Sequence, residues 1–217
     1  MMRSKILAIE AAIGGGSVAL LSGDAVLQSW HSTEAPARSE ELLARISDII
    51  GAAGIEREEL TGIAVSNGPG SYTGIRIGLA TAIGLGRSLG VPCVGVSALR
   101  AISIASGGPS RRNQVLVPIG RDGYCWQTFE NGVQTGLART GNLDTFASEI
   151  RIEPDSIIYA HGEVYPLLAG IESIRDHVVD AGRDIAVSIG LASVSIDDGL
   201  QPFYARDIPI LPAGEKV

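Results

Sequence analysis

Short apolar runs separated by glycine and polar residues follow one another through the first half of the chain. Short apolar runs that end at turn residues are typical of buried strands, whereas apolar residues spaced three and four positions apart indicate one face of a helix. The pattern predicts strands at residues 5–11, 17–21, 25–31, 62–66 and 93–96. It predicts helices at residues 39–53, 74–89 and 97–105, which makes the order β-β-β-α-β-α-β-α.

The second half repeats this order more faintly, after a turn-rich stretch at Ser106–Pro109. Strands are predicted at residues 115–119, 124–129, 133–138, 156–160 and 177–179, and helices at residues 143–150, 163–169 and 183–193. A duplicated unit of this kind is typical of the α/β superfold of actin, Hsp70 and sugar kinases (ASKHA), which places two ribonuclease-H-like domains side by side. The predicted domains are residues 1–106 and 107–217. This fold carries many functions and does not by itself identify one.

The composition is that of a folded chain and argues against direct binding of nucleic acid. Apolar residues make up 45% and charged residues 19% of the 217 residues, and the formal net charge is −7. Affinity for nucleic acid depends mostly on Lys and Arg that neutralise phosphates. We therefore expect the chain to meet RNA only through another subunit.

Cysteine usage and the apolar runs predict a cytoplasmic protein. Cys93 and Cys125 are too few for a disulfide framework or a zinc site, so we expect both to fill the core. The first residues lack the pattern of a signal peptide. No apolar run approaches the roughly 20 residues that a membrane span needs.

A glycine-rich loop, Asn67–Gly74, joins a predicted strand to a predicted helix. Such a loop can direct backbone N–H groups at an anion, but no Gly-Lys-Ser/Thr follows and the nearest cation is Arg76. The other interpretation is a tight turn in which Ser71 or Thr73 caps the helix. The residues favour the tight turn slightly.

The helix after this loop carries small residues at every fourth position, Gly74, Gly78, Ala82 and Gly86. Each glycine costs a helix roughly 1 kcal/mol relative to alanine, so the stripe indicates close approach of another backbone. That backbone belongs either to the chain's own sheet or to a partner's helix. The preceding predicted helix sets apolar residues beside an acidic pair, Glu40 and Glu41.

The residues that catalysis would need are missing from the sequence. His31, His161 and His177 are isolated from one another, and no pair has the spacing of a metal site on a helix. Ser71 lies in a tight turn but outside a G-x-S-x-G motif, and no base can be assigned to it. Peptidase activity is therefore the least supported hypothesis.

The glycine-rich loop and the start of the helix resemble the G-P-G-S-[FY]-T-G-[LI]-R-[IV]-G signature of the bacterial TsaB (YeaZ) family. Further similar segments are Lys5–Ile9, Ser39–Leu43, Gly90–Leu99 and, near the end, Gln201–Arg206. The similarity is dense over about the first hundred residues and weak in the middle. The residues that define the signature loop are Gly68, Pro69, Gly70, Ser71, Thr73, Gly74 and Arg76.

The chain departs from the family pattern at three places. The family's D-T-S-T after the first strand is replaced by Glu10–Ile13, which Gly14–Gly16 follow. The family has an acidic residue at position 120, where this chain has Gly120. Asp122 is the residue that could substitute for that acid. The histidine that usually precedes S-E-x-L-L is Arg38. A kinase or ATPase of this superfold needs carboxylates from both halves to hold Mg²⁺, and this chain lacks a convincing pair.

The resemblance implies a non-catalytic subunit, an inactive paralogue, of the machinery that makes threonylcarbamoyladenosine in tRNA. It implies a heterodimer with the catalytic TsaD-type subunit, a transient TsaE-type ATPase, and ATP and metal on those partners rather than on this chain. Alone, the chain could form a homodimer by the same surface. The alternative is a kinase or ATPase that binds ATP and Mg²⁺ through Glu10 and residues 14–17. The expected partner contacts are Leu42, Ile46, Ile75, Gly78, Leu79, Ala82 and Ile83.

Overall fold

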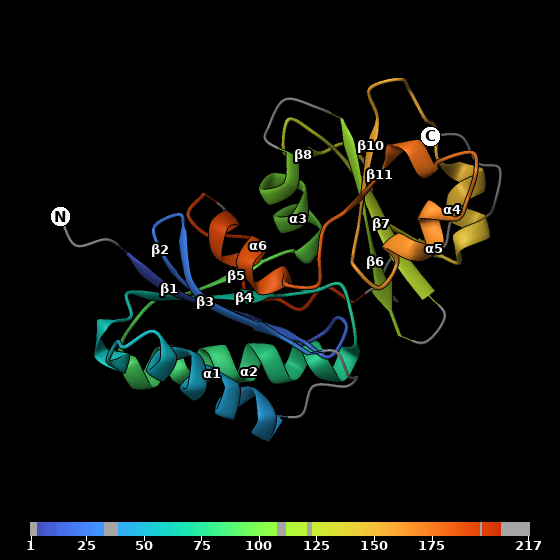
Figure 1. Ribbon diagram of the computed structural model, residues 1–217. Coiled ribbons are helices and arrows are strands. Elements are labelled where there is room, and N and C mark those ends of the chain that lie inside the picture. Colours follow the sequence, from blue (N-terminus) through green and yellow to red (C-terminus); the bar gives the residue numbers. More distant parts are fainter. Residues whose placement is uncertain (1–3, 33–38, 108–111, 121–122, 196, 205–217) are drawn as a thin grey trace.

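Two β-sheets, one from each half of the chain, organise the fold in Figure 1. The computed structural model describes residues 4–32, 39–107, 112–120, 123–195 and 197–204. The first sheet has the strand order β3-β2-β1-β4-β5, and the second has the order β11-β10-β6-β7-β8 with β9 paired to β7. The predicted α/β class with a duplicated strand and helix order is confirmed.

The first sheet combines an antiparallel hairpin with parallel strands. Its strands are β1 (Lys5–Glu10), β2 (Ser17–Ser22), β3 (Ala25–His31), β4 (Gly62–Ser66) and β5 (Cys93–Val96). β1 pairs antiparallel with β2 and parallel with β4, so the carboxyl ends of β1, β4 and β5 lie at one edge. Two helices, α1 (Ser39–Ala52) and α2 (Tyr72–Leu89), cover the lower face of this sheet in Figure 1.

The second sheet also combines antiparallel with parallel strands. Its strands are β6 (Asn113–Ile119), β7 (Gly123–Glu130), β8 (Val133–Gln134), β9 (Arg139–Gly141), β10 (Ile157–Ala160) and β11 (Val178–Asp180). Its helices are α4 (Leu143–Glu149) and α5 (Tyr165–Ala169), and a 3-10 turn occurs at Arg175–His177. A 3-10 turn of the first half lies at Arg57–Glu59. β6, β10 and β11 are parallel to one another.

The third helix of each half packs on the sheet of the other half. α3 (Ala98–Gly107) contacts β6, β7 and β10, whereas α6 (Ile185–Ala192) contacts β1, β2 and β4. The two helices also pack against each other. At Gly190 the approach is so close that an added Cβ would meet the side chain of Leu21. The boundary at residues 106 and 107 stays a prediction, because elements cross it in both directions.

Two differences from the predicted elements matter most, while several other bounds differ by one or two residues. The predicted strand at residues 133–138 is reduced to β8, and residues 139–141 form the separate strand β9 on the other end of β7. α2 begins at Tyr72 rather than at residue 74, because the Ser71 side chain accepts a hydrogen bond from the Gly74 N–H at 3.4 Å and caps the helix.

The core is continuous across the two halves. Its fully buried side chains include Leu7, Leu20 and Ile63 from the first sheet and Phe129 from the second. Cys125 is buried and Cys93 is half-buried, both as free thiols, which confirms that they act as small packing residues. In the part of the chain that is described, no helix combines the length and the apolar character that crossing a bilayer requires.

Candidate functional site

The small-residue stripe of α2 faces the chain's own sheet. A Cβ on Gly78 would lie 3.5 Å from the Ala11 Cβ and 3.7 Å from Cγ2 of Val65. A Cβ on Gly74 would overlap the carbonyl oxygen of Ala11. Of the two interpretations of the stripe, packing against the chain's own sheet is therefore correct.

The expected partner contacts stay a prediction. Six of these seven residues are buried in the chain's own fold, and the seventh, Ile83, is half-buried. Their spacing is that of the helix faces that cover the sheet, so packing within the chain accounts for it. The six core residues are Leu42, Ile46, Ile75, Gly78, Leu79 and Ala82.

The side of α2 opposite the small-residue stripe is a surface that the sequence analysis did not predict. Tyr72 is 42% exposed, and Arg76 and Ala80 are exposed one and two turns further along. With Thr73, Ile77 and Thr81 they line a shallow groove of about 420 Å³. These residues occupy positions i, i+4 and i+8 on the face away from the stripe, and that spacing is the sequence signal that could have found them.

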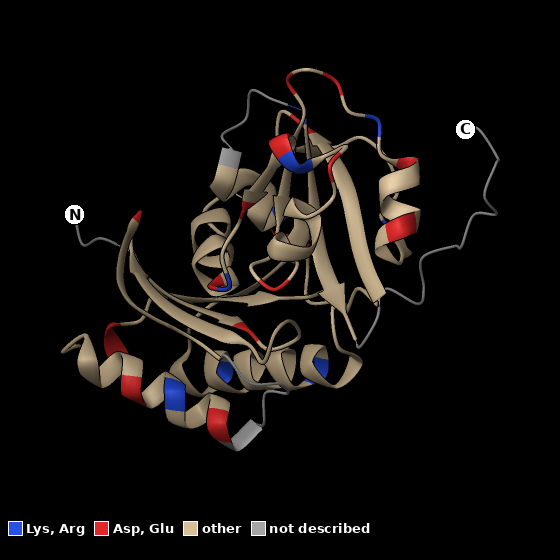
Figure 2. Ribbon diagram, turned by 45° about the vertical axis from the view of Figure 1, so that its right-hand side comes forward, with Lys and Arg blue, Asp and Glu red and all other residues tan. Residues whose placement is uncertain are grey.

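This outer face is cationic rather than acidic. α2 carries Arg76 and Arg87 and no acidic residue, as Figure 2 shows. The Arg76 guanidinium donates to the Tyr72 hydroxyl at 3.0 Å, and its carbon lies 5.2 Å from the centroid of the Tyr72 ring. On the neighbouring helix α1, Leu43 is 49% exposed. The two helices thus present apolar side chains beside a fixed positive charge.

The glycine-rich loop is a tight turn, not an open anion cradle. The Ser71 N–H donates to the Ala12 carbonyl at 2.8 Å, and the Gly68 carbonyl accepts from the Ala98 N–H at 2.9 Å. Gly68 and Gly70 have φ values of 118° and 157°, and a Cβ on Gly70 would lie 2.6 Å from the Ala12 Cβ. The loop amides therefore serve the turn and its contacts. Among the two capping candidates, Ser71 is the cap and Thr73 lies within the helix.

Glu10 closes the loop after β1 from inside the protein. Its side chain is 1% exposed, and Oε1 accepts from the Ala12 N–H at 2.5 Å and the Ile13 N–H at 3.0 Å. Oε2 is buried without a hydrogen-bond partner among the described residues. Burial raises the pKa of Glu10 to about 8, although the two backbone hydrogen bonds lower it in part. The carboxyl is therefore mostly protonated at neutral pH.

The second half packs closely against Gly14, in the loop that follows β1. A Cβ on Gly14 would lie 3.0 Å from Cε1 of His161 and 3.1 Å from Oε1 of Glu163. Glu163 is held by Arg183 at 3.3 Å. His161 is 1% exposed, and burial lowers its pKa to about 4, so its ring is neutral at pH 7. His161 and Glu163 therefore leave little room beside Gly14.

These residues do not fit ATP with Mg²⁺. The loop amides hold only Oε1 of Glu10, and burial favours its protonated form, whereas a metal ligand is a carboxylate. Gly120 carries no acid, and Asp122 lies outside the described residues, as does Arg38. Among the described residues, no group of three or more His, Cys, Asp or Glu could hold a metal ion. Of the three histidines, His161 is buried, His31 is exposed and near enough to contribute to the lowered pKa of His161, and Nδ1 of His177 lies 3.0 Å from the Ser156 carbonyl.

Comparison with known proteins supports the same fold and family. The family model of TsaD, tRNA N6-adenosine threonylcarbamoyltransferase, matches residues 33–135. The chain is 31% identical to the tRNA threonylcarbamoyladenosine biosynthesis protein TsaB of Escherichia coli, over 61% of this chain and 59% of that protein. It is 33% identical to an uncharacterized protein of Mycobacterium leprae, over 64% of this chain and 39% of that protein. The matched region thus spans less than two thirds of each relative.

Solved structures show the same arrangement over most of the chain. YeaZ from Pseudomonas aeruginosa superposes with a TM-score of 0.67 at 20% identity, covering 93% of this chain and 99% of that one. An activator of 2-hydroxyisocaproyl-CoA dehydratase from Clostridium difficile, solved with bound ADPNP, has a TM-score of 0.58 at 9% identity, covering 86% and 93% of the two chains.

The fold defines the class first: this chain is an ASKHA-type α/β protein with two ribonuclease-H-like halves. Within that class its sequence is similar to TsaB proteins, which recur among its relatives, and its fold is similar to that of YeaZ. The resemblance that the signature loop indicated is confirmed.

Proposed function

We propose that this chain is an accessory subunit of tRNA threonylcarbamoyladenosine biosynthesis that binds a TsaD-type catalytic subunit through the outer face of α2. One observation carries the proposal: a TsaB-like chain presents a groove of exposed residues on α2, within the segment that matches the TsaD family model. A homologous partner carries the corresponding helices. Two related surfaces of this kind can pair about a pseudo-two-fold axis.

The chemistry of the described residues favours an accessory role over a catalytic one. The loop that would hold a phosphate is filled by Gly14 against His161, and Glu10 is buried and mostly protonated. We place ATP and metal on the partner subunits, including a TsaE-type ATPase that joins transiently. Because the net charge is −7, tRNA is reached through the catalytic subunit, in the cytoplasm. The groove on α2 also provides the surface for a homodimer when the partner is absent.

Ala80→Arg is expected to weaken binding of the TsaD-type subunit by at least about tenfold, because the interface would bury an unpaired charge beside Arg76. Binding is measured by calorimetry with the catalytic subunit from the same organism. Formation of threonylcarbamoyladenosine in tRNA by the reconstituted subunits provides the functional readout.

Ser173→Arg is the matched control for this variant, because Ser173 is exposed on the second half of the chain, between α5 and the last 3-10 turn. Both residues are exposed, so the free energy of unfolding of each variant is expected to stay within about 0.5 kcal/mol of that of the unmodified chain. Unchanged affinity of Ala80→Arg would remove the groove as the interface. Failure of the unmodified chain to bind, together with no effect on tRNA modification, would refute the function itself.

The isolated chain is expected to show no heat of binding with ATP and Mg²⁺ at millimolar nucleotide. The reason is that Glu10 is buried and favoured in its protonated form, and that His161 and Glu163 lie close to Gly14 in the loop that would have to bind the phosphates. Saturable binding with one nucleotide per chain would restore the kinase or ATPase alternative.

A further inference from the structure

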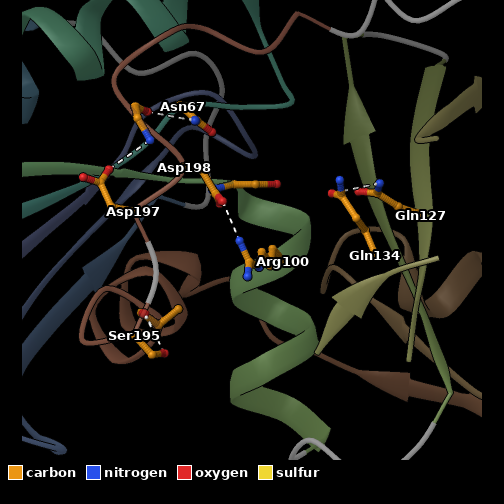
Figure 3. Close-up of polar contacts among 10 residues, drawn as sticks. Asn67, Arg100, Gln127, Gln134, Ser195, Asp197 and Asp198 are labelled. Atoms are coloured by element: carbon orange, nitrogen blue, oxygen red, sulfur yellow. Dashed lines mark hydrogen bonds and ion pairs between the residues drawn. The ribbon is translucent and has the colours of Figure 1, made fainter. Parts of the chain in front are cut away.

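Residues 197–204, which we name the C-terminal strap, return from the second half of the chain to the signature loop. Asp198 anchors this strap at the start of α3: Oδ2 accepts from the Ser97 N–H at 3.0 Å, and Oδ1 accepts from Nη1 of Arg100 at 2.7 Å. The Asp198 N–H donates to the Gly95 carbonyl at 2.7 Å. Figure 3 shows Arg100 on α3 reaching up to Asp198.

The strap is also bound to the residue that precedes the signature. The Asn67 side chain is buried, and its Nδ2 donates to the Gly199 carbonyl at 3.0 Å (Figure 3). The Phe203 N–H donates to the Asn67 carbonyl at 2.7 Å. Asn67 thus holds the strap at two points, four residues apart, through its side chain and its backbone.

Two glycines owe their identity to this strap. A Cβ on Gly95 would overlap the Gly199 carbonyl, and a Cβ on Gly68 would overlap the Phe203 carbonyl. Gly68 belongs to the signature, so one signature glycine makes room for a segment more than a hundred residues away in sequence. The strap is therefore packed into the first half, which leaves room for it at these two glycines.

The strap ends beside the groove on α2. The ring of Tyr204 lies 4.7 Å from the ring of Tyr72, centroid to centroid, at an interplanar angle of 40°. Tyr72 lines the groove, and its hydroxyl accepts the hydrogen bond from Arg76. Tyr204 therefore supports the ring that the partner would meet.

We infer that Tyr204 completes the partner-binding face of α2 and that docking of the C-terminal strap is coupled to binding of the TsaD-type subunit. The inference rests on the proposed function and names a further part of the same surface. Asp198 is the positioning residue, because it fixes the strap to α3 and so sets where Tyr204 lies. If the bound state requires the docked strap, binding must in turn stabilise the strap by the same factor.

Tyr204→Ala is expected to raise the Kd for the TsaD-type subunit by about tenfold, because an aromatic pair of this geometry is lost at the edge of the interface. Tyr204→Phe keeps the ring and is expected to restore most of the affinity. Gln201→Ala is the matched control, since Gln201 is an exposed residue of the same strap. Asp198→Asn is expected to weaken binding several-fold without altering any residue of the groove.

Hydrogen exchange on the unmodified chain gives a second measurement that needs no variant. The amides of Asp198 and Phe203 are expected to exchange at least several-fold more slowly when the TsaD-type subunit is bound. Unchanged affinity of Tyr204→Ala, or equal exchange with and without the partner, would overturn the coupling alone. Absence of binding by the unmodified chain would overturn the proposed function, and the inference with it.

Discussion

Gly74→Ala is expected to destabilise the chain by roughly 3 kcal/mol or more, although it adds only one methyl group. The added Cβ would overlap the carbonyl oxygen of Ala11, which cannot move without shifting the end of β1 and the loop that Glu10 closes. Chemical denaturation followed by circular dichroism measures the free energy of unfolding. The same substitution elsewhere in a helix is normally favourable, so the sign of the effect is the test.

Gly84→Ala is the matched control on the same helix. Apart from its chain neighbours and the backbone of its own helix, nothing described lies within 4 Å of the position that its Cβ would take, and Gly84 is exposed. We expect this variant to gain up to about 1 kcal/mol, because alanine is the better helix former. Equal stability of the two variants would show that α2 does not press against the loop after β1.

Glu10→Gln is expected to stabilise the chain by up to about 5 kcal/mol at pH 9 and to have a much smaller effect near pH 4. Burial raises the pKa of Glu10 from 4.5 to about 8, so the folded chain holds the proton more tightly than the unfolded chain. Stability from this group is therefore fully present below pH 4.5 and is lost as pH rises to about 8. Glutamine keeps the oxygen that accepts from Ala12 and Ile13 but cannot ionise.

The measurement is the difference in free energy of unfolding between variant and unmodified chain across this pH range. Taking the difference removes the contribution of groups that titrate in both proteins. Glu172→Gln, at an exposed carboxyl, is the control and is expected to show a difference near zero throughout. A pH-independent difference for Glu10→Gln would mean that Glu10 is charged and solvated in the folded chain.

The effect at Gly74 changes how any loss of partner binding must be interpreted. A bulky residue at Gly78 or a charge at Ala82 would disrupt the packing of α2 on the first sheet. Loss of binding by such variants would report unfolding. Variants at Ala80 or Tyr204 change the groove or its edge, so they separate binding from stability.

Most of the regular structure could be predicted from the sequence because local periodicity carries it. The strands at 25–31, 62–66 and 93–96 and the helix from 39 have the predicted bounds within one residue. The strand at 133–138 was wrong because its residues leave the sheet after Gln134, and β9 then pairs again with β7. Alternation of apolar and polar residues can indicate a strand, but it cannot show where pairing with the neighbouring strand ends.

The candidate site was harder to predict, for a related reason. The signature loop follows from the order of residues 68–78, and the comparisons confirm the resemblance to TsaB that it indicates. The partner contacts expected from the same helix were core residues, because an apolar stripe looks the same whether it packs on the chain's own sheet or on another subunit. The groove lies on the face that the stripe leaves out.

The sequence by itself determined the superfold, the family resemblance and the absence of the usual acidic and hydroxyl residues after the first strand, because these depend on residue order and type. Only the tertiary structure decided that Glu10 is buried, that Gly14 presses on His161, and that the C-terminal strap reaches Asn67 and Tyr72. Each of these contacts joins residues from different elements, most of them far apart along the chain. Packing distances and desolvation exist only once the two halves are placed together, and they determine which face of α2 remains available to a partner.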